Sequence, residues 1–126
     1  MIENTTFIVP LRIESTDRLR NVIVSTCYIL DNTDAKVIIQ EVDTASTFGV
    51  TALPQIKECV GDKVERLKHV FEQSNDQIFH RTRILNDMTM MAETPVVVNY
   101  DCDILLPLDS YQQEEERILD LSLIHI

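Results

Sequence analysis

Glycine, proline and aromatic residues are scarce in this chain. Its 126 residues include two glycines, four prolines and no tryptophan, and only 6% are aromatic. This composition excludes a collagen-like or low-complexity chain. Basic residues are also few, because 11 lysines and arginines stand against 21 aspartates and glutamates, and the formal net charge is -10. No basic stripe is available to neutralise phosphates, so we predict binding to neither nucleic acid nor an anionic membrane surface.

The chain also has few cysteines and no long apolar segment. Cys27, Cys59 and Cys102 are odd in number, widely spaced and form no CxxC pair. This pattern favours neither a disulfide framework nor a zinc site, and it fits a reducing compartment. No apolar run approaches the length of a membrane span, and the first residues contain no signal-peptide pattern. The sequence therefore predicts a single cytoplasmic domain without a membrane span.

The apolar residues that are present alternate between strand-like and helix-like patterns. Strands are expected at residues 7–11, 36–42, 67–71 and 96–100, and helices at 17–30, 77–92 and 111–119. Ser15 provides an N-cap for the first helix, and Pro10 is expected to end the first strand. The pattern from 43 to 64 is weak and suggests a loop with a short helix. This order of elements predicts an α/β fold with a mainly parallel sheet and flanking helices.

Polar residues follow three of the predicted strands, at Pro10-Leu11-Arg12, Glu41-Val42-Asp43 and Asp101-Cys102-Asp103. In open parallel sheets, ligands bind at the carboxyl ends of the strands. Two carboxylates spaced i, i+2 after a buried strand can bind one Mg²⁺ or Mn²⁺ ion. The alternative is a pair of loop aspartates that cap a turn. Arginines such as Arg12 and Arg81 are either phosphate contacts or solvated surface residues.

Two further stretches extend this pattern. Residues 79–86 read Phe-His-Arg-Thr-Arg-Ile-Leu-Asn, which is similar to the F-N-R-x-x-L-L-N stretch of galactosyltransferase-like enzymes. Residues 97–107 contain a strand, the D-x-D of Asp101 and Asp103, and the downstream Pro107, in the order found in that group. Together with the first strand and its Pro10-Leu11-Arg12 ending, the chain resembles GT-A-fold glycosyltransferases of the galactosyltransferase-like and family-2 groups. The resemblance covers residues 7–107 in outline.

The resemblance implies a role for each matching residue. Asp103 would bind the metal directly, and Asp101 would contact the metal shell or the ribose. Arg81 would contact the nucleotide, with Phe79 packed nearby. The remaining predicted nucleotide-sugar contacts are Pro10 and Arg12, in the nucleoside pocket, and Glu41 and Asp43, towards the base or ribose.

The implied activity is transfer of a sugar from a nucleotide diphosphate, expected to be UDP, to a glycan or other hydroxyl acceptor. Mn²⁺ or Mg²⁺ would offset charge on the departing diphosphate. Synthesis of a surface polysaccharide is a suitable setting. In these families the catalytic base lies well after the D-x-D, so we expect it beyond this chain.

The final residues depart from the pattern before them. Residues 121–126, Leu-Ser-Leu-Ile-His-Ile, follow a charged segment and match the translation of a common sequencing adapter. We therefore expect residues 1–120 to be the nucleotide-sugar-binding part of an incomplete GT-A domain and 121–126 to be an artefact.

Two other classes of protein share parts of the pattern. Haloacid-dehalogenase-like phosphatases also have a D-x-D after an apolar strand, in which Asp101 would be the nucleophile and Asp103 a general acid. A non-catalytic α/β binding module is the other alternative. The sequence contains no P-loop, no GxGxxG and no nucleophile motif for a hydrolase.

Overall fold

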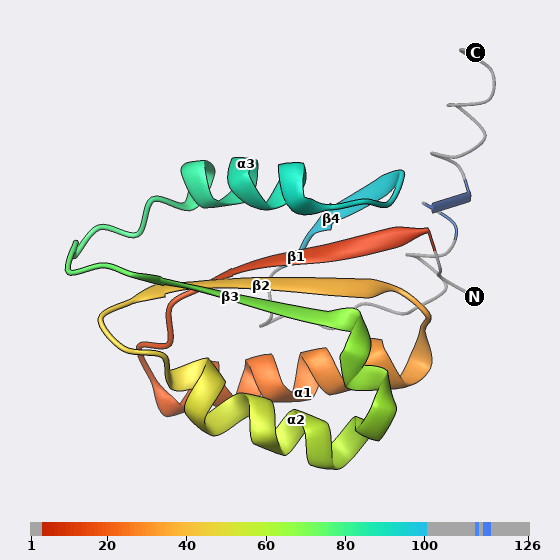
Figure 1. Cartoon of the computed structure of the whole chain (residues 1–126), viewed down its shortest axis with the longest axis horizontal. Helices are drawn as coiled ribbons and strands as arrows, with labels where there is room; N and C mark the ends of the chain where they lie inside the picture. The colour runs from red at the N-terminus through yellow and green to blue at the C-terminus, as the bar shows by residue number, and fades with distance from the viewer. Residues whose placement is uncertain (1–3, 101–112, 114, 117–126) are drawn as a thin grey trace.

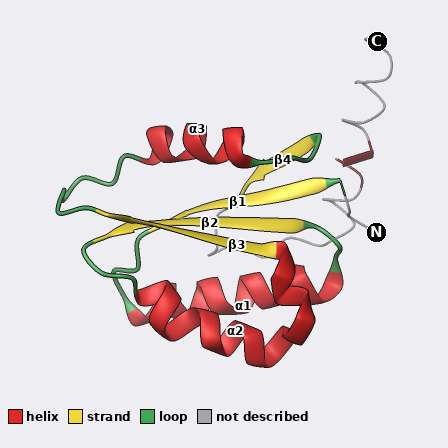
Figure 2. Cartoon of the chain, in the orientation of Figure 1, coloured by secondary structure: helices red, strands yellow, loops and turns green. Residues whose placement is uncertain are grey.

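The computed structural model describes residues 4–100, 113, 115 and 116, and within them a parallel sheet lies between two helical layers (Figures 1 and 2). The strands lie in the order β3-β2-β1-β4, and each adjacent pair is parallel. Their bounds are β1 Thr5–Leu11, β2 Lys36–Asp43, β3 Leu67–Gln73 and β4 Val96–Asn99. The predicted α/β class and parallel sheet are confirmed.

Helices cover both faces of this sheet. The helix α1 (Thr16–Asn32) and the helix α2 (Leu53–Val60) lie on one face, and α3 (Arg81–Met91) lies on the other (Figure 1). Within the described part of the chain, no helix is long and apolar enough to cross a membrane.

The two faces of the sheet differ because side chains alternate along each strand. On β1, Phe7, Val9 and Leu11 join the core beneath α1 and α2, whereas Ile8 joins the core beneath α3. The larger core also contains Val22, Ile29 and Leu30 of α1, and Phe48, Ala52, Ile56 and Val60 from the segment around α2. The smaller core contains Ile38, Val42, Ile84 and Met88. Both layers are therefore held by buried apolar side chains.

The first helix begins where the sequence predicts. Ser15 is its N-cap, and its Oγ accepts a hydrogen bond from the Arg18 backbone N–H at 3.1 Å. This bond satisfies one of the N–H groups that have no partner within the helix. The helix continues to Asn32, two residues further than expected.

The connection between β2 and β3 is more helical than the weak pattern suggested. A π-helical turn (Phe48–Ala52), α2 and a 3-10 helix (Gly61–Arg66) follow one another without a gap. Gly61 makes the change of direction after α2, with a φ of 61° that favours glycine. The apolar residues here change phase between three kinds of helix, which obscures their periodicity in the sequence.

The helix expected at 77–92 begins four residues later, at Arg81. A turn occupies the intervening residues: Ser74 Oγ accepts from the Asp76 N–H at 3.1 Å, and Asp76 Oδ1 accepts from the Ile78 N–H at 2.9 Å. Serine and aspartate side chains compete in this way with helix formation. The prediction of a helix from residue 77 was therefore wrong by about one turn.

Pro10 lies inside β1, which continues through Leu11, rather than at its end. The Tyr100 N–H donates to Ile8 O at 3.0 Å, so the backbone groups of Ile8 point towards β4. Because these groups alternate in direction along a strand, those of Pro10 point to the same side. The pairing with β4 ends at Ile8, so the missing N–H of Pro10 leaves no ladder bond unmade.

Glu115, near the end of the chain, is hydrogen-bonded to the start of β1. Glu115 is 5% exposed, and its Oε2 accepts bonds from Thr5 Oγ1 at 2.5 Å and from the Asn4 N–H at 3.2 Å. Of the charged helix expected at 111–119, residues 113, 115 and 116 are helical and the others lie outside the described residues.

Candidate functional site

The carboxyl ends of the strands define the candidate site. The chain leaves β1, β2 and β3 at the same edge of the sheet, on the left in Figure 1. From β1 the chain steps to β2 and β3 on one side, and β4 then pairs with β1 on the other. The strand order thus reverses between β1 and β4. In doubly wound sheets this switch point opens the crevice in which ligands bind.

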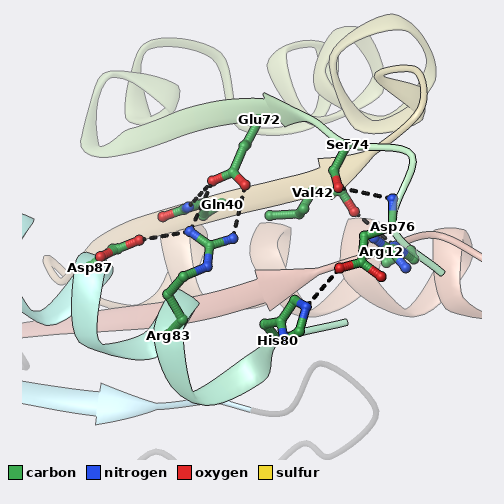
Figure 3. Close-up of polar contacts among 9 residues, drawn as sticks. All are labelled: Arg12, Gln40, Val42, Glu72, Ser74, Asp76, His80, Arg83 and Asp87. Atoms are coloured by element: carbon green, nitrogen blue, oxygen red, sulfur yellow. Dashed lines mark hydrogen bonds and ion pairs between the residues drawn. The ribbon is translucent and has the colours of Figure 1, made fainter. Parts of the chain in front are cut away.

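Arg12 follows β1 at this edge (Figure 3). Its Nε donates to Val42 O at 2.8 Å and its Nη1 donates to Gln77 O at 3.2 Å. The guanidinium carbon lies 5.4 Å from the centre of the Phe79 ring, a cation–π distance. The third nitrogen, Nη2, is buried without a hydrogen-bond partner among the residues that the structure describes. A buried cationic donor is costly unless it is paired, so this atom is suited to an anionic ligand group.

Arg81 and Asn99 form a second polar pair at this edge. Arg81 is the first residue of α3, Asn99 is the last of β4, and Arg81 Nη2 donates to Asn99 Oδ1 at 3.3 Å. The N-cap residue His80 makes no side-chain capping bond. The amino end of α3 therefore adds the positive end of a helix dipole next to an exposed guanidinium. Asn99 was not among the predicted residues, although a polar residue ending an apolar strand is a usable signal.

Asp76 and His80 complete the loop between β3 and α3. His80 Nε2 lies 2.8 Å from Asp76 Oδ2, and both side chains are about half exposed (Figure 3). The pKa of the Asp76 carboxyl is lowered, mainly by the hydrogen bond from the Ile78 backbone N–H and then by the bond to His80. The Arg12 charge lowers it further. A lowered carboxyl pKa favours the ionised form in the folded state.

We expect the pKa of the Asp76 carboxyl to lie below its ordinary value of 3.8 in the folded chain, and part of that lowering to persist in His80→Ala. The backbone bond is the larger cause, so removing the imidazole leaves it intact. The associated stability is present above the unfolded pKa and is lost as the pH falls through the folded one. NMR titration of the carboxyl carbon measures the pKa of Asp76 in the folded wild type and in the folded variant. A return to 3.8 in the variant would make His80, rather than the turn, the main cause.

Glu41 has a different environment from the other predicted residues. Its side chain is fully buried, beneath the layer that contains α2. Its Oε1 accepts from Ser46 Oγ at 2.7 Å and lies 3.2 Å from His69 Nε2. Its Oε2 accepts from the backbone N–H groups of Thr47 and Phe48, both at 3.0 Å. A carboxylate offers about four acceptor positions. The geometry thus favours a structural role for Glu41, at the start of the helical segment, over the predicted contact with a base or ribose.

Asp43 ends β2 at the same edge as Arg12. Its Oδ1 accepts from the Thr44 N–H at 2.7 Å, and its backbone oxygen accepts from the Ser74 N–H at 2.9 Å. These bonds use only part of the hydrogen-bond accepting capacity of Asp43, so its contact with a ligand stays a prediction. Pro10 is buried within β1.

A polar network joins α3 to the sheet (Figure 3). Arg83 donates two bonds to Glu72 of β3, at 2.8 and 3.2 Å, and one to Asp87 at 3.1 Å. Gln40 of β2 donates to Glu72 Oε1 at 3.4 Å. The charged members are exposed, so we expect the ion pairs to orient α3 more than to stabilise it. This network could not be predicted from the sequence, because its members lie on three separate elements.

The predicted metal ligands, Asp101 and Asp103, lie outside the described residues. They follow the short β4, whose pairing with β1 ends at Asn99. Among residues 4–100, 113, 115 and 116, no cluster of three or more His, Cys, Asp or Glu side chains is arranged to hold a metal ion. No protein-family model matches the chain, and no curated protein matches its sequence.

Proposed function

We propose that this chain is the donor-binding part of a metal-dependent glycosyltransferase. The ligand would be a nucleoside-diphosphate sugar in the crevice between the carboxyl ends of β1 and β4. The main support is the buried Arg12 Nη2, a cationic donor without a partner among the described residues, on the residue that follows β1 at the carboxyl edge of a parallel sheet. A diphosphate supplies the anionic oxygens that such a donor prefers.

Arg12 and Arg81 would both bind the diphosphate of the donor. The two hydrogen bonds and the Phe79 ring fix the plane of the Arg12 guanidinium, so its free nitrogen is held ready for a phosphate oxygen. Arg81 is more exposed and is held by a single 3.3 Å bond to Asn99, which a ligand could replace. The amino end of α3 would add favourable electrostatics for the same anion.

Asp101 and Asp103 would hold the divalent ion in this proposal. They follow the last residue of β4 by two and four positions in the sequence. Hard oxygen ligands of this kind fit Mg²⁺ or Mn²⁺. The bound ion would supply charge compensation for the departing nucleoside diphosphate. The acceptor, proposed to be a glycan hydroxyl, would need a general base that we do not assign.

The proposal predicts metal-dependent stabilisation by UDP. A ligand that binds only the folded state raises its stability by about 2.7 kcal/mol at 100 times its Kd. We expect UDP with Mn²⁺ to raise the Tm of the full chain by several degrees, and either one alone to have a small effect. Asp103→Ala should abolish the effect of UDP with Mn²⁺. Differential scanning fluorimetry measures each shift against the same variant without ligand.

Matched arginine variants separate a specific contact from general charge. Arg12→Lys keeps the charge but loses the planar fork, and we expect at least a tenfold weaker Kd for UDP–Mn²⁺ by calorimetry. Arg20→Ala removes an exposed charge from α1, on the face of the sheet opposite α3, and should leave the Kd unchanged. If wild-type chain with a folded circular dichroism spectrum shows no shift, the transferase proposal fails. Phosphatase activity lost on Asp101→Asn would then support the other enzyme class.

A further inference from the structure

A groove separates the outer surfaces of α1 and α2, on the opposite side of the molecule from α3. It measures about 440 Å³, and its lining is mainly apolar, with Ile23, Val24 and Val60 among its residues. Two cysteines line the same groove, Cys27 from α1 and Cys59 from α2. Both are free thiols in this structure. They are 32 positions apart in the sequence, so only the packing of the two helices brings them together.

The electrostatics of the two thiols indicate that they lie near each other. The pKa of Cys27 is raised to about 11, first by burial and then by the charge and the hydrogen bond of Cys59. Asp31 raises it further. The geometry of the two helices agrees, because both thiols line one groove and Lys63 Nζ lies 2.6 Å from Asp31 Oδ1, four residues after Cys59 and Cys27 respectively. Thiols in this relation can reach the S–S bond length by small changes in side-chain torsion.

We propose that Cys27 and Cys59 form a redox-sensitive pair, which a small-molecule disulfide such as oxidised glutathione converts into a disulfide bond between α1 and α2. This inference is independent of the proposed transferase activity, because the groove lies on the face opposite α3.

The reaction follows thiol–disulfide exchange in two steps. Cys59 is exposed, so its thiolate attacks one sulfur of glutathione disulfide and releases one glutathione thiolate. The Cys27 thiolate then attacks the Sγ of Cys59 and releases the second glutathione. Two protein thiols are oxidised to one disulfide, and one glutathione disulfide is reduced to two glutathiones. Cys27 is partly buried and is therefore better placed as the second nucleophile than as the first.

The disulfide between Cys27 and Cys59 would covalently join two helices of the same layer. A cross-link of this kind restricts the unfolded chain, and for a loop of this length the expected rise in Tm is on the order of 10 °C. The wide spacing of the cysteines, which argues against a permanent disulfide framework, is compatible with a bond that forms only under oxidation.

The test is oxidation of the folded full chain by glutathione disulfide, followed by intact mass and peptide mapping. We expect a loss of about 2 Da and a linked peptide pair containing Cys27 and Cys59. Cys27→Ser should stop at a stable glutathione adduct on Cys59. Cys102→Ser, which removes the remaining thiol, should close as the wild type does.

Three results would overturn the proposal. Stable glutathione adducts on both cysteines of the wild type would mean that the sulfurs cannot meet. A link from either cysteine to Cys102 would identify a different pair. Closure that occurs in urea but not in the folded chain would show that the fold separates the thiols rather than joining them.

Discussion

Replacing Glu41 by alanine is expected to cost about 3–5 kcal/mol of folding free energy, because it leaves several buried donors without an acceptor. The carboxylate is fully buried and accepts from Ser46, Thr47 and Phe48, and His69 lies beside it. These groups form the start of the helical segment that carries α2. A typical domain is stable by about 5–15 kcal/mol, so the variant would lose a large share. Urea unfolding followed by circular dichroism measures the loss.

Two variants separate the role of Glu41 from a general effect of charge. Glu41→Gln keeps an acceptor oxygen for the two backbone N–H groups, and its amide can donate to Ser46 or His69. We expect it to cost about 1–2 kcal/mol. Glu58→Ala removes an exposed glutamate from α2 and should change stability by less than about 0.5 kcal/mol. Equal losses for Glu41→Ala and Glu58→Ala would contradict the structural role.

Replacing Phe7 by alanine is also expected to cost about 3–5 kcal/mol, through a cavity in the larger core. The Phe7 side chain is 0% exposed and lies at the centre of β1, paired with Val37 of β2 and Val98 of β4. Its ring meets the Tyr100 ring edge to face, with centroids 5.6 Å apart and planes at 83°. Such aromatic pairs add about 0.5–1.5 kcal/mol to the burial of the ring. The same urea titration measures the loss.

Phe71→Ala is the matched control for this variant. Phe71 is also on a strand, but it lies on the edge strand β3 and is 39% exposed. Folding buries less of the Phe71 ring than of the Phe7 ring. We therefore expect Phe71→Ala to cost about 1 kcal/mol or less of folding free energy. A loss for Phe7→Ala that does not exceed the loss for Phe71→Ala would mean that the core around β1 can collapse into the cavity.

The parallel sheet was predictable because its strands are short apolar runs, and its first helix has a sequence-coded start. The apolar runs from Phe7 to Leu11 and from Val37 to Ile39 are typical of buried strands, and Ser15 is a favourable N-cap. The start of α3 was not predictable from periodicity. Asp76 forms a turn that delays it, and a turn depends on side-chain hydrogen bonds that leave no periodic pattern.

The candidate site was predictable only as a set of strand endings. Arg12 follows β1 in the sequence, and the rule that ligands bind at the carboxyl ends of parallel strands then marks it as a candidate ligand contact. The sequence could not indicate that two of its nitrogens are occupied by Val42 and Gln77 while the third is free. It also could not separate Glu41 from Asp43. Both end the same strand, but they differ in their hydrogen-bond partners: Glu41 binds donors at the start of the helical segment, and Asp43 binds its neighbour Thr44.

The central position of β1 has a consequence for the nascent chain. During synthesis, β2 becomes available to pair with one edge of β1 once residue 43 has emerged, but β4 is complete only at residue 99. The last residue of β4 follows the last residue of β2 by 56 positions, which take roughly 3–11 s to synthesise at about 5–20 residues per second. Through that interval the other edge of β1 is open to strands of neighbouring chains. Pro10 faces this edge and presents no N–H, so it shortens the surface on which a wrong strand could pair while the ribosome completes the sheet.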